Sequence, residues 1–131
     1  MLAIALSAGF LALATVPPAA APAPSSSAAA ASYFLVRLIP PRPTFAASMT
    51  SEERAVMDKH VAYWMAQVKT GNILIFGPIQ DPAGVYGLMI LRASSEAEAR
   101  ELTSNDPAII GHIGMRSEIY PFIKSVVGAG N

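Results

Sequence analysis

The segment from residue 49 to residue 78 constrains the fold more than any other part of this sequence, because it joins a capped helix to a buried strand. Thr50 and Glu53 have the spacing of a capping box, in which each side chain binds a free backbone N–H of the other residue. Gly71 is expected to end the helix in the left-handed conformation that glycine favours there. The apolar run 73–79 that follows predicts a strand.

Apolar residues in the predicted helix recur at spacings of three and four and therefore form one stripe. The stripe consists of Met57, Val61, Trp64, Met65 and Val68. At about 100° per residue, His60 falls on the flank of this stripe, half in the core and half out. Partial desolvation at such a boundary tunes the pKa of a side chain, so His60 is the first candidate for chemistry.

Four strands and two further helical segments complete the predicted order β-α-β-β-α-β, and the fold class is α+β. The strands are expected at 33–39, 73–79, 85–92 and 115–123, with a capped helix at 95–104 and a helical turn after Asp106-Pro107. This order is the split βαβ of the ferredoxin-like fold. Right-handed crossovers make strands one and three central in an antiparallel sheet and place both helices on one face.

Both faces of this sheet are apolar, although an uncovered antiparallel face normally alternates polar and apolar residues. In the first strand, one face has Tyr33, Leu35 and Ile39, and the other has Phe34, Val36 and Leu38. Two helices cover only one face, and monomers rarely leave such a large apolar patch exposed. The pattern therefore predicts a homodimer through the open sheet face.

The first 32 residues differ in composition from the rest, since every charged side chain lies at or after Arg37. Their apolar run is about fifteen residues long, short of the ~20 of a membrane-spanning helix. We interpret residues 1–32 as a secretory signal and an Ala/Pro/Ser linker, which predicts a periplasmic or secreted protein. The alternative is a mis-assigned start codon before a cytoplasmic protein. The domain is expected at 33–124, with a tail at 125–131.

Charge and composition exclude several classes of function. The formal net charge is zero and no Lys/Arg cluster is present, which argues against a nucleic-acid partner. The chain has no cysteine, so disulfides and a lipoprotein anchor are excluded. It contains no glycine-rich phosphate loop, no nucleophile motif and no cluster with metal-ligand spacing. We therefore expect neither a cofactor nor a metal.

Four residues are candidates for a site, and each has a structural alternative. His60 is either a general base or a boundary histidine with a local hydrogen bond. Asp106 caps the turn that follows it, which leaves one carboxylate oxygen for another partner. Arg37 either binds an anionic substrate group between helix and sheet, or reaches past the sheet edge or pairs across a dimer. Tyr63 shares the flank of His60 and is expected in a pocket, whereas Trp64 is expected in the core.

The pattern Glu-Glu-x-x-x-Met-x-x-His-x-x-Tyr-Trp over residues 52–64, followed by Gly71, Gly77-Pro78 and Asp106-Pro107, resembles the YciI-like (YCII-related) domain. The resemblance covers Tyr33 to Phe122. It implies a dimeric α/β barrel and a His–Asp pair in a pocket, formed here by His60 and Asp106. The family is similar in fold to small isomerases, dehydrochlorinases and monooxygenases of aromatic degradation.

Three functions remain open at this point. The first is a small cofactor-independent isomerase or lyase, in which His60 moves a proton, Asp106 orients it, and Arg37 or Tyr63 positions a small organic substrate. The second is a non-catalytic dimer that binds a small ligand or serves as an accessory protein. The third is a monooxygenase without a cofactor, which needs a closed apolar pocket.

Overall fold

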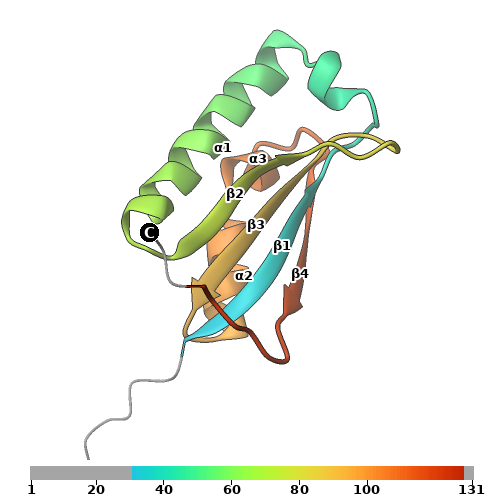
Figure 1. Ribbon diagram of the computed structural model, residues 1–131. Helices are drawn as coiled ribbons and strands as arrows, with labels where there is room; N and C mark the ends of the chain where they lie inside the picture. Colours follow the sequence, from blue (N-terminus) through green and yellow to red (C-terminus); the bar gives the residue numbers. More distant parts are fainter. Residues whose placement is uncertain (1–30, 129–131) are drawn as a thin grey trace, which may run out of the picture.

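A computed structural model describes residues 31–128, which form a four-stranded antiparallel sheet and three α-helices on one face of it (Figure 1). The elements are β1 (Ser32–Ile39), a 3₁₀ turn η1 (Phe45–Ala47), α1 (Ser51–Lys69), β2 (Ile73–Ile79), β3 (Tyr86–Ala93), α2 (Glu96–Ser104), α3 (Pro107–Ile110) and β4 (Arg116–Pro121). The predicted signal and linker at 1–32 lie almost wholly outside the described residues, so export stays a prediction. No helix within 31–128 is long and apolar enough to cross a bilayer.

The strand order is β2-β3-β1-β4, with all neighbours antiparallel. The predicted ferredoxin-like arrangement, with β1 and β3 central, is therefore confirmed. Side chains alternate along β1 as the two-residue period of a strand requires: Phe34, Val36 and Leu38 are buried under the helices. Figure 1 shows α2 and α3 behind the sheet and α1 along its β2 side, which leaves the near face without a helix.

Local signals set the helix ends. Thr50 Oγ1 accepts from the Glu53 N–H, and the Glu53 carboxylate accepts from the Thr50 N–H, which completes the predicted capping box of α1. Gly71 follows α1 with φ of +79°, as predicted. The predicted cap of α2 forms only one half of a capping box. Ser95 accepts from the Glu98 N–H, but the Glu98 carboxylate binds the backbone N–H of Ser94 instead of that of Ser95.

The predicted orientation of α1 is wrong. Of the apolar stripe only Trp64 is buried, while Val61, Met65 and Val68 are exposed, Met65 by 45%. His60 was expected on the flank but is only 5% exposed. The buried face is centred on His60 and Trp64, so the helix is rotated about its axis by roughly a sixth of a revolution from the stripe. Hydrogen bonds from these two side chains to the start of α3 account for this rotation of the helix.

Candidate functional site

His60 and Asp106 form a buried pair between α1 and the start of α3. His60 Nδ1 lies 2.8 Å from Asp106 Oδ1 and 2.9 Å from Oδ2, and the two residues are 5% and 3% exposed. They stand 46 residues apart in the chain. The association that the resemblance implied for these two residues is therefore present in the folded chain.

Two further donors orient the Asp106 carboxylate. The indole Nε1 of Trp64 donates to Oδ2 at 2.7 Å, and the backbone N–H of Ala108 donates to Oδ1 at 2.8 Å. An indole and a backbone N–H can only donate, so each oxygen of Asp106 acts as an acceptor. His60 Nδ1 then supplies the third donor and carries a proton. In the neutral imidazole this arrangement selects the tautomer with the proton on Nδ1, which leaves Nε2 with a free lone pair.

The local sequence places all the members of this cluster. His60 and Trp64 are four residues apart on α1 and so project from the same side, one turn apart. Asp106 is the N-cap of α3, with Pro107 at the first helical position, as predicted. Gly111 lets α3 approach α1, because a Cβ there would lie 2.7 Å from the Pro107 carbonyl oxygen and 2.9 Å from a Val56 methyl.

The second nitrogen of His60 opens to a cavity. Among the described residues, Nε2 has no hydrogen-bond partner, and yet no buried side-chain nitrogen or oxygen lacks one. Nε2 is therefore accessible, and His60 lines a cavity of about 500 Å³. The ring of Phe76 lies 5.6 Å from the His60 ring, tilted by 54°, and forms the wall beside it.

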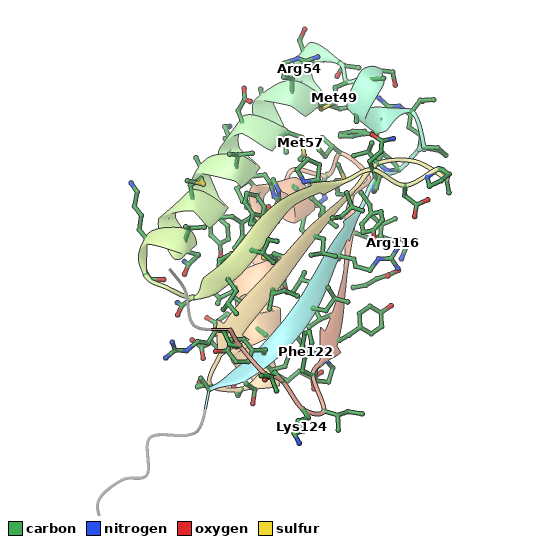
Figure 2. All side chains as sticks on the ribbon, viewed as in Figure 1. Met49, Arg54, Met57, Arg116, Phe122 and Lys124 are labelled. Atoms are coloured by element: carbon green, nitrogen blue, oxygen red, sulfur yellow. The ribbon has the colours of Figure 1, made fainter. Side chains whose placement is uncertain are left out.

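The cavity lies between the first half of α1, the η1 turn and the hairpin end of the sheet. Aromatic and methionine side chains dominate its lining: Phe45, Phe76, Tyr86, Met49, Met57 and Met115. Figure 2 shows Met49 and Met57 on the side of the helical layer that faces the sheet, whereas Arg54 points away from it. Phe45, in the proline-rich loop, is only 4% exposed and anchors this loop over the cavity.

An ion pair fastens the proline-rich loop to α1. The Arg42 guanidinium binds both oxygens of Glu53 at 2.7 Å and lies 4.9 Å from the centre of the Phe45 ring. The Arg42 hydrogen bonds, followed by the Thr50 N–H, lower the pKa of Glu53 to about 2. The same carboxylate thus caps α1 and holds the wall of the cavity that Phe45 provides.

The family model of the YCII-related domain matches residues 33–123. The chain belongs to the YCII-related domain family. A search of curated proteins finds no significant match. Membership agrees with the resemblance drawn from the motif, and it assigns no reaction to the His–Asp pair.

Tyr63 does not reach the cavity in this YCII-related protein. Its hydroxyl donates to the Leu102 carbonyl at 2.8 Å, which ties α1 to α2, and its ring packs edge-on against Trp64. Burial, followed by the charges of Asp106 and Glu101, raises the pKa of Tyr63. Tyr63 therefore remains a protonated donor at neutral pH, in the core and away from the lining of the cavity.

Of the alternatives considered for Arg37, the location between helix and sheet is not the one that the structure has. Its neighbours Val36 and Leu38 point to the helices, so Arg37 projects from the opposite face. There it pairs at 3.2 Å with Glu118, its direct partner across β1 and β4, and lies 4.7 Å above the Tyr86 ring. It lines a separate hollow of about 250 Å³.

Sequence reasoning missed one member of the cluster, Trp64, which it assigned to the core alone. The residue is fully buried, as predicted, but it also binds Asp106. A usable signal was present: a buried indole N–H needs an acceptor, and Trp64 shares a helix side with His60. Among residues 31–128, no three His, Asp or Glu side chains cluster as a metal site would require.

Proposed function

We propose that this YCII-related protein is a cofactor-independent isomerase or lyase in which His60 acts as a general base through Nε2. The observation that carries the proposal is the division of labour between the two ring nitrogens. Nδ1 is bound to Asp106, whereas Nε2 has no protein partner and is accessible in a residue that lines the cavity. A base in this position can accept a proton from a C–H or O–H group of a bound molecule.

Asp106 supports this role in two ways. Its carboxylate fixes the orientation and tautomer of the imidazole, and its negative charge stabilises the imidazolium that forms when Nε2 takes a proton. Trp64 and Ala108 hold the carboxylate in turn, so the base is positioned before the substrate arrives. The proton on Nε2 can then return to a different atom of the same molecule, which is an isomerisation, or follow the departure of a leaving group, which is an elimination.

The second candidate is a protein that binds a small ligand without transforming it. The observation that favours it is that only one group with acid–base chemistry, His60, has been placed beside a large apolar cavity. An isomerase usually needs a second group to stabilise the charge that develops on the substrate. Tyr86, the one other ionisable residue of the lining, alternates with the buried Met89 and Leu91 and points to the helix-free face, where its ring lies against Arg37.

Exchange of substrate protons with solvent tests the proposal without knowledge of the product. The protein is incubated in D₂O with a panel of small carbonyl compounds and lactones, and proton NMR follows deuterium incorporation beside the carbonyl. We expect incorporation that His60→Ala abolishes and that added imidazole partly restores, because the small base enters the space left by the side chain. His112→Asn is the matched control, since His112 is exposed and adopts a positive φ that asparagine tolerates.

A wild-type rate of exchange in His60→Ala would exclude His60 as the base. Absence of exchange across the panel, together with saturable binding of panel members, would favour the ligand-binding function.

A further inference from the structure

We infer that the cavity beside His60 takes an uncharged, mainly apolar molecule the size of a substituted aromatic ring, and that it discriminates against anions. The inference deepens the proposed function by naming the class of ligand, and it rests on that function only for the role of His60. The class of ligand itself follows from the charges around the cavity.

The lining holds no formal charge. None of the cavity residues is Lys, Arg, Asp or Glu, and the ionisable members are His60 and Tyr86. A bound carboxylate would exchange its hydration for an apolar wall without a cation to pair with, which is strongly unfavourable. A neutral ligand loses only the hydration of apolar surface, which favours binding.

The two arginines that line the adjoining hollow are each engaged by a carboxylate and an aromatic ring. Arg42 lies against the Phe45 ring and binds Glu53 through two hydrogen bonds, and Arg37 lies against the Tyr86 ring and pairs with Glu118. Neither arginine belongs to the lining of the cavity. Both line the adjoining 250 Å³ hollow, where Asp81 adds a further negative charge. Neither of these two guanidinium groups is therefore free to pair with an anionic group in the cavity.

The shape and softness of the wall favour a ring. A volume of about 500 Å³ is within the usual range for small-ligand pockets. Three methionines, Met49, Met57 and Met115, surround it, and thioethers adapt to a ligand and contact aromatic edges favourably. His60 brings an imidazole to this apolar lining, and a neutral O–H or acidic C–H is the group that its free nitrogen can engage.

Nitrobenzene and benzoate make a matched pair of probes, because they have the same shape and differ by one charge. Methyl-¹³C-methionine labelling of the full chain reports their binding by NMR. We expect nitrobenzene to shift the signals of Met49, Met57 and Met115, and to leave those of Met65 and Met89, which do not line the cavity. Benzoate should bind at least about tenfold more weakly at pH 7.

Two variants locate the binding site of nitrobenzene, and a matched pair at Met49 tests whether an added cation inverts the preference for a neutral ligand. Ala46 lines the cavity from η1 and Ala47 does not, although both are exposed. Ala46→Trp should therefore abolish the nitrobenzene shifts, and Ala47→Trp should keep them. Met49→Lys adds a cation at the wall and should raise benzoate affinity at least about tenfold relative to Met49→Gln.

Equal or tighter binding of benzoate by the wild type would overturn the inference, and so would failure of both probes to shift the lining methionines. These outcomes are independent of turnover. If nitrobenzene binds as expected while no compound exchanges protons, the ligand class stands and the catalytic function fails. If anions bind and are turned over through His60, the reverse holds.

Discussion

Trp64 Nε1 donates to the same carboxylate, Asp106, that accepts from His60 Nδ1, and so one acceptor joins two side chains from successive turns of α1. The distances to Asp106 are 2.7 Å from the indole and 2.8 Å from the imidazole. Because the donors come from α1 and the acceptor from the N-cap of α3, the cluster determines how these helices meet. It also sets which nitrogen of His60 faces the cavity.

The first prediction concerns the tautomer of His60. In the wild type, long-range ¹H–¹⁵N correlation spectra of neutral His60 should show a proton on Nδ1 and none on Nε2, because Nδ1 faces an acceptor. Asp106→Asn should remove this preference, since an amide can present a donor to Nδ1 instead. The exposed His112 serves as the internal reference. An Nε2–H tautomer in the wild type would contradict the proposed base.

The second prediction separates Trp64 from its neighbour Tyr63. Trp64→Phe removes the indole donor from a buried carboxylate, which should destabilise the fold by about 1–3 kcal/mol and lower any His60-dependent exchange. Tyr63→Phe removes a bond to the Leu102 carbonyl and should cost about 1 kcal/mol with little change in the His60 tautomer. Urea unfolding and the same NMR correlation measure both effects. An unchanged tautomer in Trp64→Phe would limit Trp64 to packing.

The third prediction is a pH dependence that arises from Glu53. The pKa of Glu53 is about 2 in the folded protein, below its ordinary value of 4.5, so the ionised form stabilises the fold. This contribution is fully present above about pH 4.5 and is lost as the pH falls through about 2. The difference in melting temperature between wild type and Glu53→Gln should therefore be constant from pH 5 upward and shrink below about pH 4.5. A difference that grows on acidification has the wrong sign for this mechanism.

The fourth prediction tests the orientation of α1. Met65 lies on the exposed side of α1. Met65→Gln should therefore change the free energy of unfolding by less than about 0.5 kcal/mol. Trp64→Ala empties a fully buried site and should cost about 3–5 kcal/mol. Chemical denaturation of both variants compares the two sides of the helix. A comparable loss for both residues would restore the orientation that the apolar stripe indicated.

The fifth prediction concerns the homodimer, which stays a proposal based on the helix-free face of the sheet. Ile75 on β2 is paired with Ile90 of β3 and is 59% exposed. We expect sedimentation equilibrium to show a dimer that Ile75→Lys weakens at least about tenfold, since a buried unpaired charge is costly. Ile110→Lys is the matched control, because Ile110 is 56% exposed but lies on α3. A monomeric wild type at high concentration would end the proposal.

Much of this molecule follows from short-range patterns. The Thr50–Glu53 capping box, the glycine stop at Gly71 and the Asp106-Pro107 helix start each depend on a few neighbouring residues, and the structure has all three. The strand order then follows from the order of elements and the handedness of their connections. These features depend on backbone hydrogen bonding and chain chirality. Both act locally, so the sequence alone determines the helix ends and the strand order.

Tertiary structure alone decided the site. The rotation of α1 about its axis, which buries His60 and exposes Met65, depends on Asp106, which is 46 residues beyond His60. Hydrophobic periodicity cannot register such a partner, because it counts apolar groups and ignores a buried carboxylate that needs donors. For the same reason, the sequence left the location of Arg37 open, because this location depends on the direction of β1 side chains and on Glu118 across the sheet. Contacts between distant segments settled which groups meet and which surround the cavity.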